Sequence, residues 1–108
     1  MLSGYRIMWV MVMFDLPVVT KPERRAAQQF RTGLLDLGFE MAQYSVYLRY
    51  CASEAQVTVL ATKVQQSLPA SGRVSLLAFT DKQYERIVSF SGRQSSAQKP
   101  VPSQLEMF

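Results

Sequence analysis

The sequence MWVMVMF at residues 8–14 gives the clearest indication of how this chain folds. Every position is apolar, which is typical of a central β-strand that is covered on both faces. The strand is expected to end at Asp15, because Leu16-Pro17 follows and a proline nitrogen has no proton to donate to a neighbouring strand. We therefore expect a strand that is buried on both sides and that terminates in a carboxylate.

The rest of the chain divides into helical and strand-like segments. Thr20-Lys21-Pro22-Glu23 has capping-box spacing, and it starts an apolar stripe that ends before Gly38. Ser53 starts a second such stripe, which reaches Pro69. The remaining expected elements are an alternating strand run at 39–50, a strand at 74–79, a polar turn at 80–83 and a short last strand at 87–90.

Residues 39–50 leave one question open. The segment alternates like a strand, but no glycine or Asn-Gly turn divides it. One long bulged strand and two short strands are both compatible with this pattern.

The order of these elements, β-α-β-α-β-β, predicts an α+β sandwich with an antiparallel sheet and two helices on one face. The other face then has no cover. Because the first strand is apolar on both sides, we expect a second copy to cover that face in a two-fold homodimer.

Composition limits the chemistry. The chain has 108 residues, of which 48% are hydrophobic, enough for one globular domain. It contains no histidine and one cysteine, which excludes histidine-based catalysis, histidine metal ligands and a cysteine-clustered zinc site. Cys51 is expected to be a passive, half-buried residue.

The net charge of +4 favours an anionic partner. No apolar run is long enough to span a membrane, and we expect a cytoplasmic protein.

Asp15 is the first candidate site residue. A lone Asp before Leu-Pro is often a turn former. A metal-binding role needs more ligands, and the nearest acids, Glu23, Asp36 and Glu40, have no metal-site spacing. In a dimer, however, two Asp15 side chains could hold one Mg²⁺ together with water and phosphate oxygens.

Basic and aromatic residues supply further candidates. Arg24 and Arg25 lie in the first turns of the helix that follows Asp15, where phosphate binding competes with simple solvent exposure. Tyr44, Tyr47 and Tyr50 could stack on bases, but alternating strand aromatics are usually packing residues.

Several motifs together resemble the second CRISPR-associated protein family, the small dimeric subunit of the spacer-acquisition complex. They are Met13-Phe14-Asp15-Leu16-Pro17, Glu23-Arg24-Arg25, Phe30-Arg31, the segment Gly38-Phe39-Glu40-Met41-Ala42-Gln43-Tyr44-Ser45-Val46-Tyr47, and Thr80-Asp81-Lys82-Gln83. The Phe-Asp-Leu-Pro and Gln-x-Ser-Val-Tyr pieces are most similar to members from type II systems. The resemblance covers 5–92, so we expect a ferredoxin-like domain at 1–92 and a flexible or partner-docking tail at 93–108.

The resemblance implies a ferredoxin-like fold, a kinked pair of strands at 39–50, and a homodimer in which Asp15 faces its symmetry mate. It also implies that Arg24, Arg25, Arg31 and Phe39 lie around a cleft or contact nucleic acid.

Two functions from different classes follow from the resemblance. The first is a scaffold that binds protospacer duplex DNA and bridges dimers of the integrase subunit. It is favoured because Asp15 alone, with no evident general base, would make a sparse active site. The alternative is a Mg²⁺-dependent endonuclease on RNA or duplex DNA that uses Asp15 from both subunits.

Overall fold

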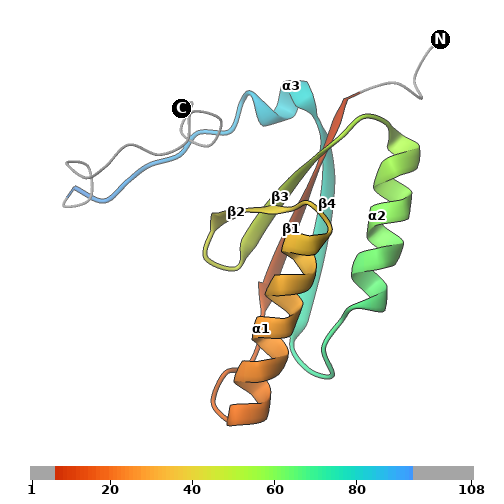
Figure 1. Ribbon diagram of the computed structural model, residues 1–108. Coiled ribbons are helices and arrows are strands. Elements are labelled where there is room, and N and C mark those ends of the chain that lie inside the picture. Colours follow the sequence, from red (N-terminus) through yellow and green to blue (C-terminus); the bar gives the residue numbers. More distant parts are fainter. Residues whose placement is uncertain (1–6, 94–108) are drawn as a thin grey trace.

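The computed structural model describes residues 7–93, and in that range it has one four-stranded sheet. In chain order the elements are β1 (Met8–Asp15), α1 (Lys21–Asp36), β2 (Glu40–Gln43), β3 (Val46–Cys51), α2 (Glu54–Gln66), β4 (Arg73–Thr80) and the single turn α3 (Asp81–Tyr84). The sheet is antiparallel with the order β2-β3-β1-β4, so β1 lies inside it (Figure 1). This is the ferredoxin-like arrangement, which confirms the expected α+β fold.

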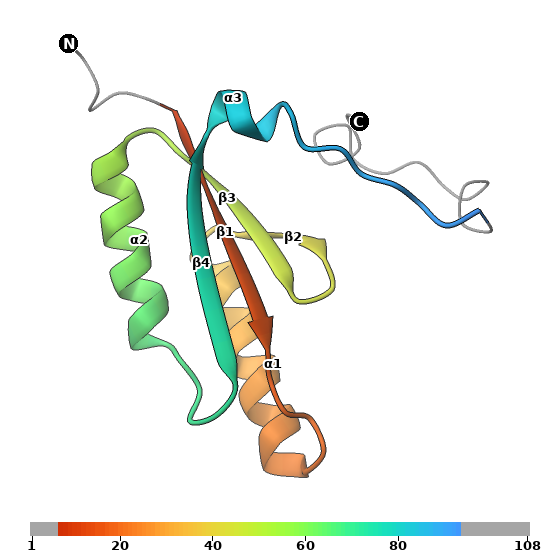
Figure 2. The ribbon, with the colours of Figure 1, turned by 180° about the vertical axis from the view of Figure 1, so that it is seen from behind.

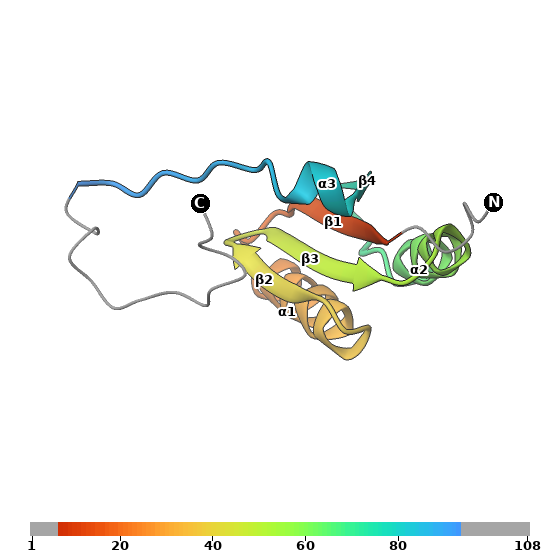
Figure 3. The ribbon, with the colours of Figure 1, turned by 90° about the horizontal axis from the view of Figure 1, so that it is seen from above.

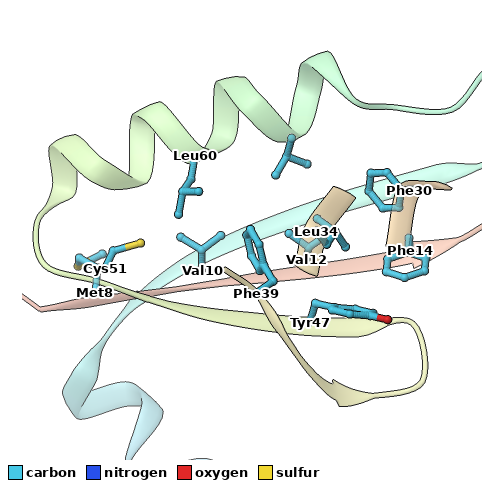
Figure 4. Close-up of a cluster of buried hydrophobic side chains, with 11 residues drawn as sticks. Met8, Val10, Val12, Phe14, Phe30, Leu34, Phe39, Tyr47, Cys51 and Leu60 are labelled. Carbon is cyan, nitrogen blue, oxygen red and sulfur yellow. The ribbon is translucent and has the colours of Figure 1, made fainter. Parts of the chain in front are cut away.

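Both long helices pack on one face of the sheet. Val10 and Val12 of β1 are fully buried there, in one cluster with Phe30 of α1 and Leu60 of α2 (Figure 4). Figure 3 shows α1 and α2 on one side of the sheet and α3 on the other. The prediction of two helices on one face is therefore confirmed.

The opposite face, which we call the open face, is covered at one end only. The Trp9 ring stacks on Tyr84, with ring centroids 3.8 Å apart and planes 10° apart. Trp9 Nε1 also donates a hydrogen bond to Asp81 Oδ1 at 2.8 Å. Nearer the Asp15 end of β1, Met13 is only half-buried and Leu77 of β4 is 51% exposed. No element of the same chain was expected on the open face, but α3 covers its Trp9 end. The Asp15 end keeps an uncovered apolar patch.

Residues 39–50 form two strands, the kinked pair that the resemblance implies. A β-bulge lies between Met41 and Gln43, and Ser45 in the turn has φ 67°. That left-handed conformation is usually taken by glycine or asparagine, which is why no turn could be recognised in the sequence.

The predicted polar turn at 80–83 does close β4, as the single helical turn α3, but the predicted last strand at 87–90 is wrong. Thr80 caps α3, since its Oγ1 accepts a hydrogen bond from Gln83 N. The next backbone amides continue this turn, with Ile87 N donating to Tyr84 O at 3.1 Å. Local helical bonds therefore take the donors that a strand would have used. The second helix, α2, ends at Gln66, before the end of its apolar stripe, which was expected to reach Pro69.

The tail expected at 93–108 lies outside the described residues except for Arg93. Within residues 7–93, no helix combines the length and hydropathy that a bilayer crossing requires.

Candidate functional site

Asp15 is the last residue of β1, and its side chain is exposed. Side chains alternate along a strand, so Asp15 lies on the open face while Phe14 packs into the helix-covered core. The carboxylate makes no hydrogen bond or ion pair with another residue of 7–93, and Thr20 rather than Asp15 caps α1. The turn-former interpretation thus has no support in the hydrogen bonds around Asp15.

Two residues that sequence reasoning missed adjoin Asp15. Arg73 starts β4 directly opposite Asp15 in the β1–β4 register, so both side chains belong to the same face. Gly72 has φ +103°, and a Cβ there would lie 3.0 Å from the Asp15 carbonyl oxygen and 2.7 Å from Leu16 Cδ2. Glycine therefore lets the loop before β4 approach the end of β1 and bring Arg73 alongside the carboxylate.

The segment between Asp15 and α1 is held by a complete capping box. Glu23 Oε1 accepts hydrogen bonds from Thr20 N at 2.9 Å and from Val19 N at 3.0 Å. The bond from the Thr20 amide is the main reason why the pKa of Glu23 lies below its ordinary value. Arg24 Nη1 donates to Val19 O at 2.7 Å and to Val18 O at 3.2 Å. Arg24 thus holds the loop that follows Asp15.

The three arginines that were expected to bind nucleic acid have different surroundings. Arg25, next to Arg24, is exposed, and its side chain has no hydrogen bond or ion pair within residues 7–93. Arg31 is half-buried, and its Nη2 donates to the Tyr44 hydroxyl at 2.9 Å. Its guanidinium carbon lies 6.0 Å from the Phe14 ring centroid. Of the three, Arg25 is the one that can bind a phosphate without giving up an existing contact.

The aromatic residues that were candidates for base stacking differ in their exposure. Tyr47 is 3% exposed and stacks on Phe14 in the core, as packing predicts. Tyr44 is 75% exposed and Tyr50 is 50% exposed, so their rings remain accessible. Phe39 is 2% exposed in the same core as Tyr47, so the expected contact between Phe39 and nucleic acid is wrong.

The acidic and cysteine side chains of one chain do not form a metal site by themselves. Residues 7–93 contain no group of three or more His, Cys, Asp or Glu side chains that could hold an ion. Cys51 is fully rather than half buried, and burial raises the pKa of its thiol, which fits the passive role predicted for it. At the end of β1 a hard cation would find the single exposed carboxylate of Asp15, and its remaining oxygen ligands must come from elsewhere.

Comparison with known proteins is consistent with this architecture. The sequence model of the family described as "CRISPR associated protein Cas2" matches residues 8–87. A protein named "CRISPR-associated endoribonuclease Cas2" from Paracidovorax avenae is 57% identical over 108 residues, which is all of both chains. A protein of the same name from Flavobacterium psychrophilum is 40% identical over 107 residues, covering 99% of this chain and 93% of that one.

A solved structure titled "Crystal structure of cas2" shares the fold. Its TM-score is 0.53 at 21% sequence identity, and the match covers 89% of this chain and 99% of that one. The chain therefore belongs to the CRISPR-associated Cas2 protein family.

Proposed function

We propose that this protein is a Mg²⁺-dependent endoribonuclease that works as a homodimer, with Asp15 from both subunits at the reaction site. The observation that carries the proposal is the position of Asp15, an exposed and unpaired carboxylate at the end of the central strand. The relatives that cover the whole chain are named endoribonucleases, and this supports the RNA-cleaving alternative more than the scaffold.

Dimerisation through the open face would explain two features together. Leu77 and Met13 leave apolar surface on that face, and Asp15 lies on the same face. A two-fold axis that covers this surface near the end of β1 would bring two Asp15 side chains towards each other. Two carboxylates and water would then provide the oxygen ligands that Mg²⁺ prefers, which one chain cannot do.

The residues around Asp15 can bind and orient a phosphodiester. Mg²⁺ bound there would lower the pKa of coordinated water and offset the negative charge that develops on the phosphate. Arg73, on the same face as Asp15, and Arg25, near the start of α1, provide guanidinium groups for phosphate oxygens. Arg24 contributes indirectly, since it holds the loop between Asp15 and α1.

A cleavage assay on the purified protein tests this proposal. Single-stranded RNA should be cut in the presence of Mg²⁺, the activity should disappear with EDTA, and added Mg²⁺ should restore it. Duplex DNA of the same sequence serves as the second substrate. RNA that stays intact under all metal conditions would contradict the proposal, and so would cleavage that is indifferent to EDTA.

The scaffold for protospacer duplex DNA, which would also dock the integrase subunit, is the second candidate. It is favoured by the exposed cationic side chains on α2, on α3 and just after α3, namely Lys63, Lys82 and Arg86. They lie on elements other than β1 and the start of α1. Salt-dependent binding of duplex DNA without any nuclease activity would move the assignment to this function.

The neighbouring arginines Arg24 and Arg25 give a matched pair of variants. Arg25→Ala should weaken binding of every RNA sequence about equally and reduce the slope of log affinity against log salt by about one, because one phosphate contact is lost. Arg24→Ala should chiefly lower the melting temperature, since it removes two hydrogen bonds to the loop. Salt-titrated binding and thermal melts of both variants check this, and the reverse pattern would show that the two roles are exchanged.

A further inference from the structure

We propose that Tyr44 stacks on an unpaired base of single-stranded RNA and that Arg31 positions its ring. This inference rests on the proposed endoribonuclease function, whose substrate Tyr44 would hold. It concerns binding of the RNA, not the cleavage step.

Tyr44 lies at the turn between β2 and β3 and is exposed in an unusual way. Its side chain is 75% accessible, whereas Tyr47, three residues further on, is almost completely buried. Despite this exposure the ring is held in place, because its hydroxyl accepts a hydrogen bond from Arg31 Nη2 at 2.9 Å. The guanidinium carbon of Arg31 also lies 5.1 Å from the centroid of the Tyr44 ring. An aromatic ring that is both accessible and oriented loses little freedom when a base stacks on it.

Arg31 is placed to orient Tyr44. Its guanidinium carbon is 6.0 Å from the Phe14 ring centroid, and its Nε is buried with no hydrogen-bond partner. A half-buried cation against Phe14 has limited room to swing out to a phosphate. The contact it does make, at the Tyr44 hydroxyl, fixes the ring.

The turn that carries Tyr44 is attached to the end of β1. Ser45 O accepts a hydrogen bond from Phe14 N at 3.1 Å, one residue before Asp15. Ser45 itself has φ 67°, which gives the turn its tight course. Arg31 and Phe14 place the Tyr44 ring on the helix side of the sheet, whereas the Asp15 carboxylate lies on the open face. A base on Tyr44 would therefore belong to a nucleotide near the end of β1 but on the other side of the sheet from that carboxylate.

Base stacking on Tyr44 would select for single strands. In a duplex, each internal base is already stacked on both sides and its flat surfaces are closed to a side chain. An unpaired base offers a free face, and stacking on an aromatic side chain contributes to binding without requiring a particular base. Duplex DNA should therefore gain nothing from Tyr44.

The experiment measures binding in an Asp15→Asn background, so that the RNA is not cut. Tyr44→Ala should weaken binding of a single-stranded RNA by roughly 5-fold to 150-fold, the range that loss of one stacked base gives, and leave duplex DNA binding unchanged. Tyr44→Trp should retain RNA binding. Leu35→Ala, which removes another exposed apolar side chain, this one on α1, is the matched control and should have no effect. In RNA that carries 2-aminopurine, binding should quench the probe with Tyr44 present and not with Tyr44→Ala.

A double-variant cycle tests the role of Arg31. If Arg31 acts through Tyr44, Arg31→Ala should weaken RNA binding alone but add little to Tyr44→Ala. Additive losses would show that Arg31 contacts RNA itself and would overturn the positioning role. Equal losses on RNA and duplex DNA, or unchanged RNA binding by Tyr44→Ala, would overturn base stacking while leaving the endoribonuclease proposal standing. Failure of the protein with Tyr44 intact to bind RNA at all would overturn both.

Discussion

Asp15→Asn is expected to abolish Mg²⁺-dependent RNA cleavage, with a loss of roughly a hundredfold or more, because bound Mg²⁺ contributes several kcal/mol to the stabilisation of the transition state. Asparagine keeps the volume of the side chain and an acceptor oxygen but removes the charge that holds the cation. Initial cleavage rates of the two proteins over a Mg²⁺ titration measure the effect.

Metal-free RNA binding is the control for this variant. A carboxylate repels phosphate unless a cation lies between them, so Asp15→Asn should bind RNA as well as the wild type or slightly better. The variant should also fold normally, since the Asp15 side chain is exposed and makes no hydrogen bond or ion pair within residues 7–93. Full cleavage by this variant would place the activity at another site, and loss of folding would make Asp15 structural.

If the proposed dimer forms through the open face, Leu77→Glu is expected to convert it to monomers at micromolar concentration and to remove cleavage with it. Leu77 is 51% exposed on the open face, where it lies opposite Met11 of β1. Burial of an unpaired carboxylate in an apolar interface costs several kcal/mol, which is enough to dissociate a small dimer. Light scattering coupled to gel filtration gives the molar mass directly.

The matched control is Leu35→Glu, the same substitution at a leucine of α1 that is 54% exposed. It should remain dimeric and active, because α1 packs on the opposite face of the sheet from the proposed interface (Figure 2). A wild-type monomer, or dissociation by Leu35→Glu rather than by Leu77→Glu, would place the interface elsewhere or remove it.

The elements with strong periodic or capping patterns could be predicted from the sequence. An apolar run ending in Asp-Leu-Pro located β1 and its end, and the Thr20–Glu23 spacing located the start of α1. Gly38 adopts φ +90° just after that helix, as a left-handed helix end predicts. In these cases the residues of a single segment determine its own conformation.

Predictions that depend on tertiary contacts were less successful. Residues 87–90 look like a strand, but local bonds to α3 and the packing of Ile87 and Tyr84 around Trp9 determine their course. The turn at Ser45 was not recognised because serine rarely adopts a positive φ. Both cases show local preference overridden by the surrounding structure.

Much of the candidate site depends on pairing between distant segments. Arg73 lies opposite Asp15 because of the register between β1 and β4. Tyr44, in the turn between β2 and β3, accepts a hydrogen bond from Arg31 of α1. Neither pairing has a pattern in one segment of sequence. The difference between Arg24 and Arg25 is equally hidden, because adjacent residues on a helix point in different directions.

The most direct test of a site shared between two subunits is a subunit-mixing experiment. Wild-type and Asp15→Asn chains with different affinity tags are mixed in equal amounts under conditions that allow exchange, and exchange is complete when about half of all dimers carry both tags, as random pairing requires. If both Asp15 side chains are needed, only wild-type homodimers cleave, and activity per total protein falls to about a quarter of the wild-type value, as random pairing of two subunits requires. Independent sites in each subunit would instead leave about half of the activity, and that result would contradict the shared Asp15 site.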